Sequence, residues 1–165
     1  MAIVKKLKQH PPLPPSRYEV GIYCRVSTAS KTRVVSTGHQ MSGLIADVAN
    51  SQHVRLYDVY LDIQSGRTSD NRKNLMRLLD DCKAGRVTLV YTKSISRFAR
   101  NTVDVLTIVR ELKKVNVPVY FENEQLYSFD KEAELAISLH GAIAQGESEN
   151  KSENRISMYQ SSYGT

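Results

Sequence analysis

The chain has 165 residues, of which 41% are hydrophobic and 24% charged, so it holds enough apolar material for one compact domain with a hydrophobic core. No apolar run approaches the roughly 18 residues of a membrane-spanning helix, and the chain starts with lysines and prolines instead of an apolar signal core. These features predict neither a membrane protein nor an exported one, and we expect a cytoplasmic protein.

The two cysteines, Cys24 and Cys82, lie far apart in the sequence. They form neither a CxxC pair nor part of a Cys/His cluster, which disfavours a disulfide framework and a zinc site and fits a reducing compartment. The sequence also lacks a GxxxxGK[ST] phosphate loop. It therefore offers no sign of a bound metal or nucleotide.

The formal net charge of +6 is unevenly distributed along the chain. Basic residues exceed acidic ones over residues 1–119, whereas acidic residues dominate residues 120–153. A basic face suits a polyanion such as DNA, because neutralising phosphates releases counterions and supplies sequence-independent affinity. An ordinary solvated surface would explain the charge equally well, so charge alone leaves DNA binding open.

A basic, proline-rich lead-in occupies residues 1–17, and we expect it to be extended because proline cannot donate backbone hydrogen bonds. Beyond it, strand-like and helix-like patterns alternate. The predicted strands are residues 19–26, 54–61, 87–92 and 117–122. The predicted helices are residues 36–50, 72–84, 102–115 and a long one over 131–157, in which the apolar Leu135, Ile137, Leu139 and Ile143 suggest that the first half packs and the second projects.

This alternation predicts an α/β fold with a mostly parallel sheet of four to five strands, covered by helices on both faces. We expect a compact domain over residues 18–130, followed by a long helix and tail over 131–165. Ligands of such sheets gather at the carboxyl ends of the strands. Ser27, Asp62 and residues 94–100 all follow a predicted strand.

One serine and four arginines at these strand ends could build a phosphate site. Arg25 precedes Ser27 by two residues, so both side chains lie on one side of the strand. Serine is a weak nucleophile and needs a base or a cationic surround, which arginine can supply while it grips phosphate oxygens. Arg97 and Arg100 share a helical face, and Arg72 follows the second strand. Each residue alone has a plainer explanation as a turn, cap or surface residue; their coincidence favours a phosphate-binding site.

Several motifs, in order, resemble the serine recombinases, the family of resolvases, invertases and large phage or transposon integrases. The resemblance covers roughly residues 18–155, and the wording KSISRFARNT together with the long spacing from Ser27 to Gln40 resembles the large branch. The motifs are YCRVST, Ser36 with Gln40, LDIQSGRTSDNR, CKAGRVTLVYTKSISRFARNT, VPVYFENE and AIAQGESENKSE.

The resemblance implies that Ser27 attacks a DNA phosphodiester, giving a 5′-phosphoserine and a free 3′-hydroxyl before strand exchange and religation. It implies that the arginines activate Ser27 and bind the scissile phosphate, that no cofactor is needed, and that dimers or tetramers form through the long final helix. The residues that the resemblance assigns are the catalytic Ser27, Arg25, Arg72, Arg97 and Arg100, the supporting Tyr23, Gln40, Asp62, Ser96 and Glu147, and the DNA-binding Arg33 and Lys93.

The sequence departs from the family pattern at several positions. Ser96 stands where short resolvases have an acid, Arg33 replaces a frequent glutamine, and Ile63 with Gln64 replace an acid and a small residue before SG. Neither a helix-turn-helix nor a zinc ribbon is present, so we expect this chain alone to bind DNA weakly and without strong sequence preference.

Two alternatives remain open at this point. The first is a truncated or regulatory recombinase domain that acts by association with full-length partners. The second is an unrelated flavodoxin-like enzyme or nucleotide-binding module. The second would need a glycine-rich first loop, and the loop after YCRVST has no glycine before Gly38.

Overall fold

The computed structural model describes residues 17–27, 42–43, 45–46, 48–50, 52–64 and 72–162. Five strands and four helices are complete within this part of the chain. The strands are β1 (Tyr18–Ser27), β2 (Val54–Gln64), β3 (Leu89–Thr92), β4 (Val119–Phe121) and β5 (Leu126–Tyr127), and the helices are α3 (Lys73–Lys83), α4 (Ile95–Phe98), α5 (Thr102–Lys114) and α6 (Ala133–Ser162).

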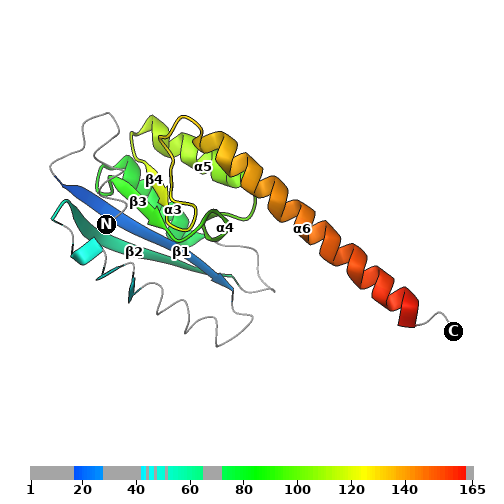
Figure 1. Ribbon diagram of the computed structural model, residues 1–165. Coiled ribbons are helices and arrows are strands. Elements are labelled where there is room, and N and C mark those ends of the chain that lie inside the picture. The colour runs from blue at the N-terminus through cyan, green and yellow to red at the C-terminus, as the bar shows by residue number, and fades with distance from the viewer. Residues whose placement is uncertain are drawn as a thin grey trace.

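The strands form one sheet in the order β2-β1-β3-β4-β5 (Figure 1). The first four strands in this order are parallel to their neighbours, and β5 pairs antiparallel with β4. This confirms the predicted mostly parallel sheet of four to five strands. The fifth strand has two residues, which is too short for an alternating pattern to reveal it in the sequence.

The sheet is covered on both faces, because successive strand residues point to opposite sides. One core cluster joins Tyr23 and Tyr60 to apolar residues of α3, α5 and the start of α6. The other cluster joins Val20 and Ile22 to Val48, which lies in the predicted helix 36–50. Of that helix the structure describes residues 42–43, 45–46 and 48–49, which are helical, and Asn50, which lies in a turn. The predicted two-sided covering is therefore confirmed.

The element boundaries differ from the predicted ones where long-range bonds decide them. Strand β2 continues to Gln64, three residues beyond the predicted end, because its last residues pair with the end of β1. Strand β3 begins at Leu89 instead of Val87. The backbone N–H of Val87 donates to the carbonyl of Asp81 at the end of α3, so this residue closes a turn before the strand starts.

Helix α6 packs with fewer residues than predicted, and its second half extends away from the body of the domain (Figure 1). Ala133 and Ile137 are buried. Leu135, Leu139 and Ile143 are 67%, 60% and 57% exposed, so the prediction that they pack against the domain is wrong. The reason is the helical period: residues 135, 139 and 143 share a face that is turned away from Ile137. Within the described residues, no helix is long and apolar enough to cross a membrane.

Candidate active site

The carboxyl ends of β1 and β2 lie side by side and present the predicted site residues at one edge of the sheet. Arg25 pairs in register with Asp62, and Ser27 pairs with Gln64. Ser27 is the last residue of β1, and its side chain lies outside the described part of the structure. The strand therefore delivers the predicted nucleophile to the edge where parallel sheets bind ligands.

Asp62 is a buried carboxylate that joins β1, β2 and α3. It accepts a hydrogen bond from the Tyr23 hydroxyl at 3.1 Å and from the backbone N–H groups of Asn74 and Leu75 at 3.0 Å each. Arg72, at the N-cap of α3, offers no side-chain cap of its own, so Asp62 satisfies the first free N–H groups of the helix from a neighbouring strand. These two bonds from α3 to Asp62 fix the start of the helix and, with it, the position of Arg72.

The Tyr23 hydroxyl remains a hydrogen-bond donor at neutral pH. Burial raises the pKa of Tyr23, and the adjacent Asp62 carboxylate raises it further, while the charges of Arg72 and Arg25 oppose the shift. The two guanidinium groups are therefore close enough to Tyr23 to act on its ionisation. Tyr23 and Asp62 thus form a fixed support beneath two of the predicted arginines.

Arg25 bridges β2 and α4. Its Nη1 donates to the side-chain oxygen of Gln64 at 2.9 Å, and its Nη2 donates to the backbone carbonyl of Ser96 at 3.3 Å. Both acceptors are neutral, so these bonds orient the guanidinium without cancelling its charge. Gln64, a departure from the family pattern, therefore orients Arg25 in this chain.

Arg97 lies on the single turn of α4, near the end of β1. Burial raises the pKa of the Cys24 thiol, and the Arg97 charge opposes that shift, which places the guanidinium near β1. Among the residues that the structure describes, the Arg97 side chain has no hydrogen-bond or ion-pair partner. It is half-buried and keeps its positive charge available.

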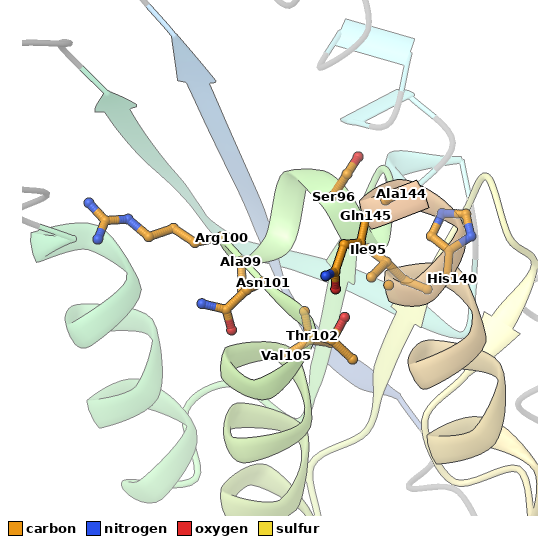
Figure 2. A pocket seen from close by; sticks show the side chains of 11 residues that line it. Ile95, Ser96, Ala99, Arg100, Asn101, Thr102, Val105, His140, Ala144 and Gln145 are labelled. Carbon is orange, nitrogen blue, oxygen red and sulfur yellow. The ribbon is translucent and has the colours of Figure 1, made fainter. Parts of the chain in front are cut away.

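Arg72 and Arg100 complete the set of predicted arginines. Arg72 donates to Asp104 at 2.8 Å, and Asp104 is held in turn because its backbone N–H donates to the side chain of Asn101, the N-cap of α5. Arg100 is exposed just before α5. It lies at the border of a cavity of about 320 Å³ between α4, α5 and α6, and Figure 2 shows its side chain extending away from that cavity.

The remaining predicted site residues lie in different parts of the domain. Lys93 is ion-paired with Glu122 at 2.6 Å, and Ser96 is exposed with its hydroxyl 3.1 Å from that of Ser94. Glu147 is exposed on α6 and has no hydrogen bond or ion pair among the described residues. Gln40, Arg33 and Ser36 lie outside the described residues.

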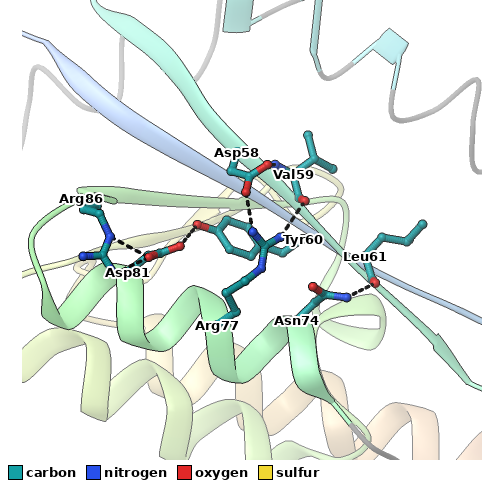
Figure 3. Close-up of polar contacts among 8 residues, drawn as sticks. All are labelled: Asp58, Val59, Tyr60, Leu61, Asn74, Arg77, Asp81 and Arg86. Atoms are coloured by element: carbon teal, nitrogen blue, oxygen red, sulfur yellow. Dashed lines mark hydrogen bonds and ion pairs between the residues drawn. The ribbon is translucent and has the colours of Figure 1, made fainter.

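A second polar network holds α3 against β2 along the helix (Figure 3). The Tyr60 hydroxyl donates to Asp81 at 2.5 Å, and Arg86 donates to the same carboxylate at 2.7 Å. Arg77 pairs with Asp58 at 2.6 Å and lies over the Tyr60 ring. Asn74 adds a bond to the backbone of β2 at 2.7 Å. These contacts keep α3, and so Arg72, rigidly placed.

Sequence reasoning missed the roles of two residues that hold arginines of the site. Gln64, which the sequence marks only as a departure from the family pattern, holds Arg25, and Asp104, to which the sequence assigns no role, holds Arg72. A signal for Asp104 existed, because Asn101 followed three residues later by an acid is a helix-start pattern. No local pattern predicts the role of Gln64, because its partner Arg25 lies far away in the sequence.

The comparison with known families identifies the family of this chain. The sequence profile described as "Resolvase, N terminal domain" matches residues 20–161, which is most of the chain. The chain belongs to the resolvase family. Among solved structures, it is similar to a resolvase-family site-specific recombinase from Streptococcus pneumoniae, with 26% identity, a TM-score of 0.61, and coverage of 90% of this chain and 100% of that one.

Other proteins to which this resolvase-family chain is similar are named as a site-specific recombinase and an integrase. It is 28% identical over 125 residues to the R46 site-specific recombinase of Escherichia coli, covering 76% of this chain and 60% of that protein. The catalytic domain of TP901-1 integrase has the same fold, with 20% identity, a TM-score of 0.57, and coverage of 81% of this chain and 98% of that domain. The chain spans about 60% of the length of the curated resolvase relatives from Escherichia coli and Pseudomonas putida.

Proposed function

We propose that this chain is the catalytic part of a serine site-specific recombinase. In this proposal Ser27 attacks a DNA phosphodiester, the bond from phosphorus to the 3′-oxygen breaks, and the serine proton ends on the departing 3′-hydroxyl. The 5′-phosphoserine link conserves the phosphodiester energy, so the reverse attack by a 3′-hydroxyl rejoins the strands. Residues 18–130 perform the chemistry, and residues 131–165 serve assembly.

The observation that carries the proposal is the position of the arginines around the end of β1. Arg25 is held by neutral acceptors, Arg97 keeps its charge beside the same strand, and Arg72 is fixed at the start of α3. Fixed cations stabilise the charge that develops on the phosphoryl oxygens during transfer. A regulatory domain without catalysis would have no need of this arrangement, so the geometry favours the enzyme.

The test is covalent capture of DNA with a nicked substrate that prevents religation. The wild-type protein is expected to form an adduct whose mass includes the DNA 5′-end, and Ser27→Ala is expected to form none, because the attacking oxygen is gone. Ser138→Ala, at an exposed serine of α6, is the matched control and should react like the wild type. An adduct that survives Ser27→Ala would refute the assignment.

We further propose that two copies of the chain associate through the exposed apolar face of α6. Leu135, Leu139 and Ile143 lie four residues apart, are each more than half exposed, and follow one another along one side of a helix that leaves the domain. An apolar stripe of this kind is costly in water and is typical of a helix–helix interface.

Analytical ultracentrifugation tests the interface. Leu139→Glu places a charge in the middle of the stripe and is expected to shift the protein toward the monomer by at least about tenfold in dissociation constant. Ser138→Glu adds the same charge on the neighbouring side of α6 and should have little effect. Equal self-association of Leu139→Glu and wild type would contradict the proposed interface.

A further inference from the structure

Glu124 lies in the turn between β4 and β5 and touches two helices at once. Its Oε2 accepts a hydrogen bond from the backbone N–H of Ile95, the first residue of α4, at 3.3 Å. Its Oε1 lies 3.2 Å from Nε2 of His140 on α6. The side chain of Glu124 is 16% exposed, so a largely buried carboxylate joins α4 to α6.

Helix α4 needs such an external hold because it is a single turn. It has four residues, and the side chain of its N-cap, Ser94, makes no capping bond. A single turn is not stable by itself, because the entropy lost in fixing its backbone dihedrals outweighs the stabilisation from one or two hydrogen bonds. The other anchors are Phe98, whose ring packs edge-on against Tyr23 and Phe121, and the bond from Arg25 to Ser96.

A cavity beside α4 reduces the packing that could hold this turn, so the contact with Glu124 contributes more to its position. The cavity of about 320 Å³ lies between α4, the start of α5 and α6, and its lining includes Ile95, Ser96, Arg100 and His140 (Figure 2). Side chains of α6 therefore leave part of the Ser96–Arg100 segment without close packing. The Glu124 carboxylate provides a polar link across this loosely packed region.

We propose that Glu124 is a positioning residue: its carboxylate fixes the α4 turn that carries Ser96 and Arg97, and its pairing with His140 ties that turn to α6. The proposal rests on the function proposed above, because α4 matters for catalysis through Arg97. His140 acts through Glu124 and is the weaker member, since it is 45% exposed and exposed ion pairs contribute little.

Hydrogen exchange tests the positioning without any need for activity. In Glu124→Ala the Ile95 amide loses its acceptor, and its exchange is expected to speed up by about tenfold, while the Val105 amide, bonded to the Asn101 carbonyl in α5, keeps the wild-type rate. Glu124→Gln retains an oxygen acceptor and should keep Ile95 protected. Unchanged exchange at Ile95 in a folded Glu124→Ala protein would overturn the proposal.

Adduct formation on nicked DNA tests the consequence for chemistry. At saturating DNA, where a loss of affinity no longer limits the rate, Glu124→Ala is expected to react about tenfold or more slowly, because a displaced Arg97 stabilises the transition state less well. His140→Ala should have a smaller effect, and the double variant should match Glu124→Ala, because His140 acts through Glu124. Glu132→Gln, at an exposed acid just before α6, is the control and should be neutral.

The outcomes separate the two proposals. If the wild type forms no adduct, the catalytic function fails, while the exchange of the Ile95 amide still decides whether Glu124 positions α4. If the wild type reacts and the effects of Glu124→Ala and His140→Ala multiply, the two residues act independently and the positioning link is wrong.

Discussion

Arg72 and Arg100 occupy electrostatically unfavourable places, because each lies just before the first turn of a helix. The N-terminus of a helix carries a partial positive charge and repels cations. Arg72 precedes α3 and Arg100 precedes α5, whereas Arg97 lies in the last turn of the short helix α4. A carboxylate near the start of each helix offsets the positive charge there, either by accepting a hydrogen bond from a backbone N–H of the first turn or by pairing with an arginine. These acids are Asp62 for α3, Glu124 for α4 and Asp104 for α5.

Asp81 offers a pH-dependent test of the network that holds α3. The hydrogen bond from Tyr60 and the pairing with Arg86 lower the pKa of Asp81 below its usual value, against the opposing effect of burial. A carboxyl whose pKa is lowered in the folded state adds stability above its unfolded pKa of about 4, and that stability is lost as pH falls through the folded pKa. The contribution of Asp81 should therefore be complete at neutral pH and vanish in acid.

Asp81→Asn is expected to reduce the free energy of unfolding by roughly 1–3 kcal/mol at pH 7, since Asn keeps an acceptor for Tyr60 but loses the charge that pairs with Arg86. The difference from wild type should shrink steadily as the pH is lowered from about 5 toward 2. Urea titrations at several pH values measure this directly. Asp80→Asn, at the exposed neighbouring position, is the control. A difference of constant size across this range would contradict the assigned role.

At the scale of elements, the close approach of α6 to α5 depends on a glycine. A Cβ added to Gly141 would overlap the Thr102 side chain and lie 2.8 Å from its Cβ. Thr102 is the first residue of α5, so this contact seats α6 beside the start of the helix that follows Arg100. A larger residue must push the two helices apart or displace Thr102, and either change disturbs the border of the site.

Gly141→Ala is expected to destabilise the domain by roughly 1–3 kcal/mol, although alanine is the better helix former. Gly146→Ala is the matched control in the same helix: nothing lies within 4 Å of the added Cβ, so it should be neutral or stabilise the domain by up to about 1 kcal/mol. Thermal unfolding of both variants gives the comparison. Combining Gly141→Ala with Thr102→Ala should restore part of the loss. Equal effects of the two glycine substitutions would show that packing against Thr102 is unimportant.

The elements themselves were largely predictable, because each long strand and helix carries its own period of apolar residues. The site was predictable as far as the ends of strands could bring Arg25, Ser27 and Asp62 to one edge. Its fine arrangement was not, because it depends on partners distant in sequence. Asp62 caps α3 from β2, and Gln64 orients Arg25 from the neighbouring strand. The exposed stripe of α6 was misassigned because helical spacing marks an apolar face without saying what covers it.

At the scale of the whole molecule, internal pairing decides which cations are available to DNA. Much of the positive charge of the described domain is neutralised by an acid of the same chain. The ion pairs are Arg55–Glu19, Arg72–Asp104, Arg77–Asp58, Arg86–Asp81, Lys93–Glu122, Arg110–Glu134 and Lys114–Glu111. The net charge therefore says less about DNA binding than the position of Arg25 and Arg97, whose charges no described acid neutralises through an ion pair.

The salt dependence of DNA binding tests this distribution of charge. Each phosphate neutralised by a protein cation adds about 0.9 to the slope of log affinity against log salt on duplex DNA. Arg97→Ala is therefore expected to reduce the slope by roughly 0.9 and to weaken binding similarly on DNA of any sequence. Arg77→Ala removes a cation that is paired with Asp58 beside α3 and should leave the slope nearly unchanged. Fluorescence anisotropy with a labelled duplex at four or more salt concentrations measures both. If the two variants lowered the slope equally, DNA binding would depend on the overall charge of the domain, and Arg97 would not be a specific phosphate contact.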